Sequence, residues 1–162
     1  MSQRPLLFLD VDGVVSPFGG GPPPGYRRSE IDGYQVTWSP SHRHEFAALA
    51  EMFDVVWATT WEHKANEAIS PLLGLPRLPV VEFGTSRSGD TWKLAKVAER
   101  AGDRPLAWVD DELFADARAW AEQREPATLL LRPSSSVGLT DEHFAELQAF
   151  GRAMNEADDG AT

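Results

Sequence analysis

The stretch that indicates the fold class is LLFLDVDG, residues 6–13. Its first four residues are apolar with no polar alternates, which is typical of a strand covered on both faces of a parallel sheet. Two acids, Asp10 and Asp12, and then Gly13 follow directly where that strand ends. Ligands of open α/β sheets bind beyond the carboxyl ends of the strands. The stretch therefore predicts a first parallel strand that carries two carboxylates into a binding site.

Similar apolar runs recur along the chain and alternate with helical patterns. We predict strands over residues 5–9, 54–59, 78–83, 106–109 and 128–131. Helices are predicted between them, one beginning at Pro40 and others over residues 61–70, 90–102, 112–123 and 140–154. This alternation predicts an α/β fold, a doubly wound, three-layer Rossmann-like arrangement around a central parallel sheet of about five strands. We expect a single domain over residues 1–154 and a polar, disordered tail over residues 155–162.

The segment after the first strand departs from this alternation. Residues 16–25 read SPFGGGPPPG, which suits neither a helix nor a central strand. Asp32-Gly33 then stands between two β-like runs, which is typical of a tight hairpin turn. We predict a small β-hairpin over about residues 26–38. Two interpretations stay open: a flap over a site at the end of the first strand, or a surface hairpin packed on the domain edge.

The composition of the 162 residues excludes several classes of protein. The chain has 15 Lys and Arg against 25 Asp and Glu, a formal net charge of −10, so it offers no basic field for gripping phosphate backbones. It has no Cys, which excludes disulfide scaffolds, thiol nucleophiles and thiolate metal sites. The N-terminal apolar run is too short for a signal peptide, and no run approaches the roughly 18 apolar residues of a membrane span. We therefore expect a cytoplasmic protein with no membrane partner.

The carboxyl ends of the predicted strands, with the start of one helix, bring polar side chains to one edge of the sheet. These side chains are Asp10, Asp12, Thr59, Thr60, Lys93, Asp110 and Asp111. Carboxylates crowded in this way need a cation, and oxygen ligands without Cys favour a hard ion, Mg²⁺. Mg²⁺ held by carboxylates commonly takes a substrate phosphate oxygen as a further ligand, which points to phosphoryl chemistry. In that chemistry one Asp serves as nucleophile and another as acid and base, while a hydroxyl and an ammonium stabilise the phosphoryl oxygens.

The order of these residues resembles the four motifs of the haloacid dehalogenase (HAD) superfamily of phosphohydrolases. The matching stretches are LDVDG at 9–13, VVWAT at 55–59, Lys93 within DTWKLAKVAERAG at 90–102, and AWVDD at 107–111. The resemblance implies that Asp10 is the nucleophile and that Asp12 is the general acid and base. It implies that Thr59 and Lys93 hold the phosphoryl group. It also implies a metal site formed by Asp10, the backbone carbonyl of Asp12, Asp110 and Asp111.

Several assignments within this set stay open. Either Thr59 or Thr60 contacts the phosphate, with the other available as a helix N-cap, and the family pattern favours Thr59. One of Asp110 and Asp111 binds the metal directly, while the other caps the following helix. Lys93 has the alternative of an exposed helix residue. Its place in a first helical turn, where acids are preferred, favours a specific anionic partner.

These observations predict a Mg²⁺-dependent phosphatase that hydrolyses a small phosphomonoester through an aspartyl-phosphate, with a small flap in place of a large cap domain. The alternatives are a receiver-like phosphate-binding module, a non-catalytic HAD-like domain, and a phosphatase of the same superfamily that acts on nucleic-acid ends, as in RNA repair. A receiver places its Lys after its paired acids, whereas Lys93 precedes Asp110 and Asp111. The acidic net charge makes a nucleic-acid end the less favoured partner, although contact with an end needs little basic surface. The sequence indicates neither the substrate nor the oligomeric state.

Overall fold

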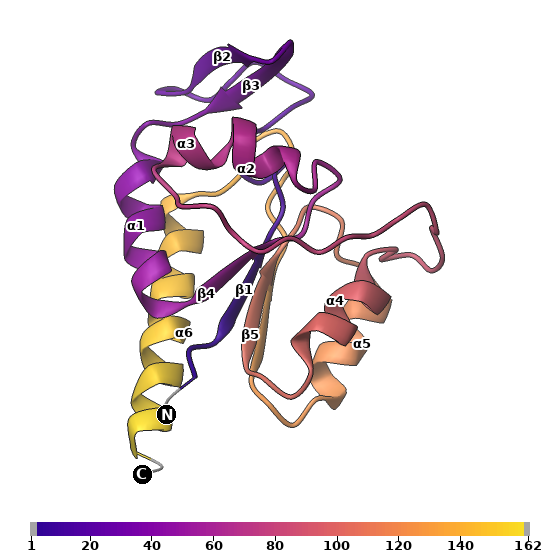
Figure 1. The fold of residues 1–162 in the computed structure, drawn as a ribbon. Coiled ribbons are helices and arrows are strands. Elements are labelled where there is room, and N and C mark those ends of the chain that lie inside the picture. Colours follow the sequence, from indigo (N-terminus) through magenta and orange to yellow (C-terminus); the bar gives the residue numbers. More distant parts are fainter. Residues whose placement is uncertain (1–2, 161–162) are drawn as a thin grey trace.

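The computed structural model describes residues 3–160, and its centre is a four-stranded parallel sheet (Figure 1). The strands are β1 (Leu6–Leu9), β4 (Asp54–Trp57), β5 (Leu106–Val109) and β6 (Thr128–Leu131). They lie in the order β4-β1-β5-β6, and each neighbouring pair is parallel. Because β1 lies between β4 and β5 and all the strands end at the same edge, the residues that follow them meet there.

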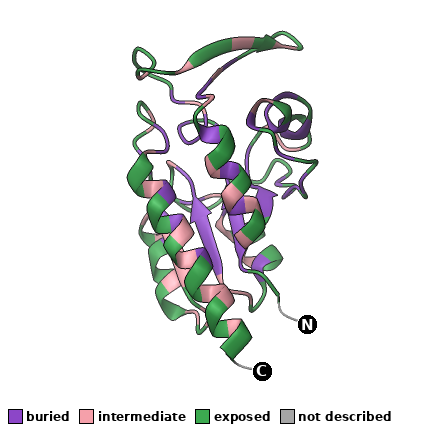
Figure 2. Cartoon of the chain, turned by 90° about the vertical axis from the view of Figure 1, so that its left-hand side faces the viewer, coloured by how far each residue is buried: buried purple, intermediate pink, exposed green. Residues whose placement is uncertain are grey.

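Helices cover both faces of this sheet. They are α1 (His42–Met52), α2 (Lys64–Ala68), α3 (Ser70–Leu73), α4 (Leu94–Ala101), α5 (Ala115–Gln123) and α6 (Asp141–Gly160). Helices α1 and α6 lie on one face, and α4 and α5 lie on the other (Figure 1). Leu7 and Leu9 of β1 join the hydrophobic cluster under α1 and α6, whereas Leu6 and Phe8 join the cluster under α4 and α5. The predicted doubly wound α/β fold is therefore confirmed, with two helical layers (Figure 1) around strands that are mostly buried (Figure 2).

The sheet has four strands rather than the predicted five, because residues 78–83 form no strand. The stretch runs beside β4, where one parallel bridge joins Val80 to Trp57. Trp57 N donates to Pro79 O and Val81 N donates to Trp57 O, each at 2.9 Å. Pro79 has no N–H to donate, so the pairing with β4 cannot continue from Val80 back toward residue 78. The apolar side chains of the stretch are buried all the same, which explains why it resembles a strand in sequence.

The predicted helix over residues 61–70 is two short helices, α2 and α3. Pro71 lies in the first turn of α3 instead of ending a helix, at a position where its missing N–H leaves no hydrogen bond unmade. Between the two helices and residue 78 lies a buried amide. Asn66 Nδ2 donates to Leu78 O and Asn66 Oδ1 accepts from Leu78 N, both at 2.8 Å. This pair of bonds attaches α2 to the extended segment beside β4.

Helix α6 continues to Gly160, beyond its predicted end. Residues 155–160 are therefore helical instead of a disordered tail, and residues 161–162 lie outside the described part of the chain. Asn155 Nδ2 donates to Met52 O at 3.0 Å, which attaches this last part of α6 to the end of α1. Neither α6 nor any other described helix is both long enough and apolar enough to cross a bilayer.

The predicted hairpin is present as a separate antiparallel sheet of β2 (Arg27–Ile31) and β3 (Tyr34–Trp38). Its turn residues Asp32 and Gly33 have φ of 51° and 81°, the left-handed conformation that a two-residue hairpin turn requires at both positions. The hairpin lies above α2 and α3, at the edge of the domain where the strands of the main sheet end (Figure 1). This position is consistent with the flap interpretation, and also with a surface hairpin packed on the domain edge.

Candidate active site

The carboxyl ends of β1 and β5 hold two buried carboxylates. Asp10 follows β1, and its Oδ1 accepts a hydrogen bond from Val11 N at 2.8 Å. Asp110 follows β5, and its Oδ1 accepts from Glu112 N at 2.9 Å. The N–H of Asp10 donates to a carbonyl of β5 and that of Asp110 to a carbonyl of β6, at 3.2 and 3.1 Å. The ladder of the sheet thus continues one residue beyond each strand and fixes both carboxylates at the same edge.

Lys93 lies between these two carboxylates. Its Nζ is 2.7 Å from Asp110 Oδ2 and 3.2 Å from Asp10 Oδ1, and it donates to Ala58 O at 3.0 Å. Each of the three protons of the ammonium therefore has an acceptor. The side chain is only 6% exposed, which rules out the alternative of an exposed helix residue.

The segment that carries Lys93 is anchored just before α4. Thr91 donates to Asp116 from both its N–H, at 2.9 Å, and its Oγ1, at 2.6 Å. Thr91 Oγ1 also accepts from Phe114 N at 2.9 Å. Burial would raise the pKa of Asp116, but the hydrogen bonds from Thr91 hold that pKa below its usual value. These bonds tie the start of α4 to the start of α5 and so direct Lys93 toward the cluster.

Burial changes how readily the groups of this cluster ionise. Burial raises the pKa of Asp10 well above its ordinary value, although the charge of Lys93 acts in the opposite direction. Burial and the charge of Asp110 raise the pKa of Asp111. Burial alone would lower the pKa of Lys93, but Asp10 and Asp110 more than offset it, so that this pKa lies above its ordinary value. Lys93 is therefore a cation at neutral pH that only partly neutralises its neighbours.

Three of the acids are close enough together to bind one metal ion. Carboxylate oxygens of Asp10, Asp110 and Asp111 all lie within 4.8 Å of one another. Three ionised carboxylates and the ammonium of Lys93 leave a formal charge of −2, which a divalent cation offsets. This all-oxygen donor set fits a hard ion such as Mg²⁺, which takes its remaining ligands from water and substrate. The carboxylate of Asp12 is not part of the group, so a metal contact from its backbone carbonyl stays a prediction.

Gly13 allows Asp111 to approach the end of β1. The φ of Gly13 is +79°, and a Cβ added there would lie 2.5 Å from Asp111 Oδ2. Asp111 is held from its other side, because its carbonyl oxygen accepts from Arg132 Nε at 3.0 Å. Only glycine combines the left-handed conformation with so close an approach. Gly13 of the LDVDG stretch is thus required because the carboxylate of Asp111, which follows β5, lies against it.

Asp12 is exposed and has a partner that no sequence motif indicates. Its Oδ2 accepts a hydrogen bond from Trp61 Nε1 at 3.0 Å. Trp61 packs against Tyr34 of β3, with 5.2 Å between ring centroids, and Tyr34 OH accepts from Lys64 Nζ at 2.5 Å. Trp61 therefore links the hairpin to Asp12. Such a contact between residues far apart in sequence becomes visible only when the chain is folded.

Replacing Trp61 by Phe removes the N–H that holds Asp12 but keeps an aromatic ring against Tyr34. If Asp12 protonates the leaving oxygen, kcat should fall about tenfold for an alkyl phosphate, whose leaving group needs an acid, and much less for an aryl phosphate. Steady-state kinetics on both substrates measure the difference, with Trp120→Phe on α5 as the matched control. An equal loss on both substrates would show that Trp61 does not act through Asp12.

The two threonines after β4 have different surroundings. Thr59 is fully buried, and its Oγ1 accepts from Trp61 N at 3.2 Å, so it caps the turn that follows the strand. Thr60 is exposed and lines a cavity together with Asp10 and Lys93. Thr60 therefore lines the cavity beside the cluster, whereas the family pattern favours Thr59, and the choice between the two hydroxyls stays a prediction.

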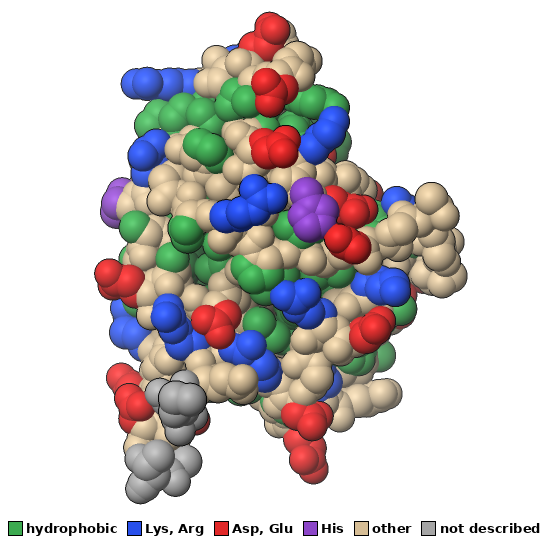
Figure 3. Space-filling model, viewed as in Figure 1, with side chains coloured by type: hydrophobic (Ala, Val, Ile, Leu, Met, Phe, Trp, Pro, Cys, Tyr) green, Lys and Arg blue, Asp and Glu red, His purple; other side chains and the backbone are tan. Residues whose placement is uncertain are grey.

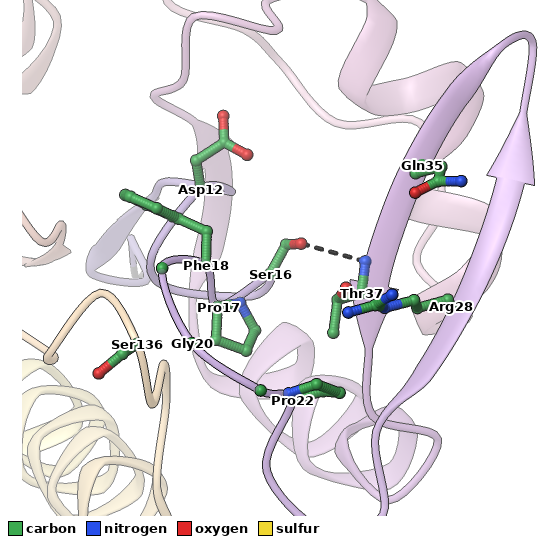
Figure 4. Close-up of a pocket in the computed structure, with 12 residues that line it drawn as sticks. Asp12, Ser16, Pro17, Phe18, Gly20, Pro22, Arg28, Gln35, Thr37 and Ser136 are labelled. Atoms are coloured by element: carbon green, nitrogen blue, oxygen red, sulfur yellow. Dashed lines mark hydrogen bonds between the residues drawn. The ribbon is translucent and has the colours of Figure 1, made fainter.

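Two adjoining cavities open at this edge of the sheet. The smaller one, of about 180 Å³, is lined by Asp10, Asp12, Thr60, Trp92, Lys93 and Asp111, among others. The larger one, of about 330 Å³, lies between residues 16–22 and the hairpin (Figure 4). Asp12 and Phe18 line both cavities. Phe18 lies outside the four motifs, whereas Trp92 lies within the stretch DTWKLAKVAERAG, directly before Lys93.

One known family matches the part of the chain that builds this edge. The family model described as the HAD domain in Swiss Army Knife RNA repair proteins matches residues 6–144. That range contains all four strands of the main sheet and all the polar side chains brought together at their ends. No curated protein and no solved structure matches the chain.

Proposed function

The chain belongs to the family of HAD domains found in Swiss Army Knife RNA repair proteins, and on this premise we propose that it is a Mg²⁺-dependent phosphohydrolase acting through an aspartyl-phosphate. One observation carries the proposal: buried Lys93 contacts both Asp10 and Asp110, with an oxygen of Asp111 in ligand range. Burying so many charges is unfavourable compared with apolar packing, and strongly perturbed ionisable groups gather at functional sites.

In the first step the Asp10 carboxylate attacks phosphorus, and the bond between phosphorus and the leaving oxygen breaks. Asp12 gives its proton to that oxygen, so the leaving group departs as an alcohol. The ammonium of Lys93 places a positive charge beside the non-bridging oxygens, where negative charge is concentrated in the transition state, and the hydroxyl of Thr59 or Thr60 donates to one of them. The hydrogen bond from Val11 N to Asp10 Oδ1 keeps the nucleophile oriented.

In the second step water displaces Asp10 from phosphorus. Asp12, now ionised, takes a proton from the water as its oxygen bonds to phosphorus, and the bond from phosphorus to the Asp10 oxygen breaks. Phosphate leaves, and both carboxyl groups return to their starting states. The N–H of Trp61 holds Asp12 near the reacting oxygens through both steps.

Asp10, Asp110 and Asp111 are the residues that would hold Mg²⁺. The bound ion supplies positive charge that offsets the repulsion between this acidic cluster and an incoming phosphate. Lys93 contributes a single positive charge against three carboxylates, which is why we propose that the metal is obligatory.

A nucleic-acid end is the second candidate substrate, and the match to a family from RNA repair proteins favours it. The net charge of the chain is −10, and Figure 3 shows acidic and basic side chains interspersed on one face, with no continuous basic track. Binding along a phosphate backbone is therefore not supported. An end needs only its terminal phosphate at Asp10 and room beside Asp12 for one nucleotide, which the 330 Å³ cavity offers.

Phosphate release from a defined panel tests the proposal. The panel contains an aryl phosphate, sugar phosphates, nucleotides, and oligonucleotides phosphorylated at either end, each with Mg²⁺ and with a chelator. We expect release only with Mg²⁺. Faster release from small phosphomonoesters supports the first substrate class, and faster release from oligonucleotide ends supports the second. Release that continues in chelator, or no release from any substrate, would contradict the proposal.

Thermal unfolding tests the metal site without turnover. A ligand at about 100 times its Kd adds about 2.7 kcal/mol of stability, so Mg²⁺ should raise the Tm. Asp111→Asn should reduce this rise because it removes one ligand. Asp103→Asn, in an exposed loop between α4 and β5, should keep it. An equal rise in both variants would place the bound ion elsewhere.

A further inference from the structure

The larger cavity lies where the leaving group must go. Asp12 lines both the smaller cavity, with Asp10 and Lys93, and the larger one of about 330 Å³. A general acid has to contact the oxygen that it protonates. If Asp12 has that role, as the proposed function states, the leaving group extends from Asp12 into the larger cavity.

The walls of this cavity come from two segments that are tied together. Residues 16–22 form one wall, and Arg28, Gln35 and Thr37 of the hairpin form the other. Ser16 Oγ accepts from Thr37 N at 3.2 Å, and this bond spans the cavity wall in Figure 4. The cavity is therefore a defined space between the first loop and the hairpin.

Arg28 is the single cation in the lining of this cavity. Among residues 3–160 its side chain takes part in no hydrogen bond, ion pair or ring contact. Figure 4 shows Arg28 extending from the hairpin toward the loop wall, with Asp12 on the far side of the cavity. An arginine fork without a protein partner suits an anion with several oxygens, such as a phosphate group.

We propose that this cavity binds a leaving group that carries a second phosphate, and that Arg28 recognises that phosphate. The preferred substrate is then a phosphomonoester on a nucleotide with another phosphate nearby. That chemistry occurs in a free nucleoside bisphosphate and in the end of a nucleic-acid strand. Arg28 therefore sets substrate preference and takes no part in the bond changes at phosphorus.

The test compares kcat/KM for nucleoside 3′- and 5′-monophosphates with kcat/KM for the 3′,5′-bisphosphate and for dinucleotides with a terminal phosphate. We expect a preference of about tenfold or more for substrates with the second phosphate, because bidentate charge-assisted bonds are strong. Arg28→Gln should reduce this ratio to about one. Arg27→Gln, at the neighbouring arginine of β2, which is exposed like Arg28 but does not line the cavity, should keep it. A larger preference for the dinucleotide identifies the strand end as the source, and a larger one for the bisphosphate identifies the free nucleotide.

A binding measurement separates this proposal from the proposed function. Calorimetry with Asp10→Asn protein, Mg²⁺ and the nucleoside bisphosphate should show affinity about tenfold weaker when Arg28→Gln is added. No phosphate release from any substrate would count against the phosphohydrolase, while this binding difference would still support the role of Arg28. An equal kcat/KM preference for substrates with the second phosphate in Arg27→Gln and Arg28→Gln would overturn the proposal. So would loss of the preference in Lys96→Gln, since Lys96 lies on the exposed side of α4 and lines neither cavity.

Discussion

Replacing Asp10 by Asn is expected to lower phosphate release by about 10⁴-fold or more, which is the scale on which removal of a nucleophile acts. The amide has nearly the same shape and can still accept from Val11 N, but it cannot form an aspartyl-phosphate. Lys93 keeps its shorter contact, to Asp110 at 2.7 Å. Steady-state phosphate release with a saturating aryl phosphate and Mg²⁺ measures the loss.

The stability of the same variant shows whether the loss is chemical. Burial raises the pKa of Asp10 in the folded protein, so its ionised form is disfavoured by folding and its contribution to stability falls as pH rises through that raised pKa. Removing this charge should therefore leave the Tm at pH 7 unchanged or higher. Asp103→Asn is the matched control and should keep full activity. Near-normal turnover in Asp10→Asn would contradict the proposed mechanism.

Replacing Lys93 by Met is expected to impair both activity and folding. The rate should fall by about 10²–10³-fold, because the positive charge beside the phosphoryl oxygens is lost. Without Mg²⁺ the free energy of unfolding should fall by about 3–5 kcal/mol, because Asp10 and Asp110 stay buried with no cation between them. Denaturant unfolding with and without Mg²⁺ measures the second effect, and the ion should restore part of the loss.

The pH dependence of this deficit has a definite sign. Asp10 becomes neutral as the pH falls through its raised pKa, which removes one of the two buried charges, so the deficit should be largest near neutral pH and shrink below that pKa. Lys96→Met, on the exposed side of α4, is the matched control and should change stability by about 0.5 kcal/mol at most. A deficit that grows at lower pH, or one that Lys96→Met shares, would show that Lys93 does not neutralise these acids.

The sequence predicts that Asp10 and Asp110 meet at one edge of the sheet, because each of them directly follows a strand that can be recognised in the sequence. Asp10 and Asp110 each follow a short, fully apolar strand, and parallel strands end at one edge, so their meeting needs no knowledge of side-chain positions. Lys93 follows no strand, and its local signal is its place in a first helical turn, where acids are preferred. Its place depends on the order of the motifs, and the structure shows that the Thr91–Asp116 bonds direct it.

The contacts around Asp12 lay beyond prediction for a physical reason. The bond from Trp61 to Asp12 joins residues whose separation depends on a turn after β4, and that turn also decides which threonine faces the cavity. Thr59 has the motif position, and its Oγ1 accepts from Trp61 N, which leaves its hydroxyl proton free to donate. The order of the residues in the sequence does not indicate which of the two adjacent threonines is buried and which lines the cavity.

Two predictions were wrong, a fifth strand over residues 78–83 and a disordered tail that includes residues 155–160, because contacts elsewhere in the fold decide the structure of both segments. Residues 78–83 are as apolar as a buried strand, yet Pro79 ends their pairing with β4 after one bridge. Residues 155–160 are polar, and they are helical as a continuation of α6, with Asn155 bonded to the end of α1. At Pro79 a backbone N–H is missing, and at Asn155 a side-chain amide bonds to the backbone of α1, and the composition of the segment indicates neither.

The central claim is that phosphate passes through Asp10, and trapping the intermediate tests it most directly. The protein is mixed with a phosphomonoester that it hydrolyses and with Mg²⁺, quenched in acid within one turnover, digested and analysed by mass spectrometry. We predict a phosphoryl adduct on the peptide that contains Asp10, absent from Asp10→Asn and lost on treatment with hydroxylamine. Hydrolysis with no adduct at any time, or an adduct on another residue, would contradict the account.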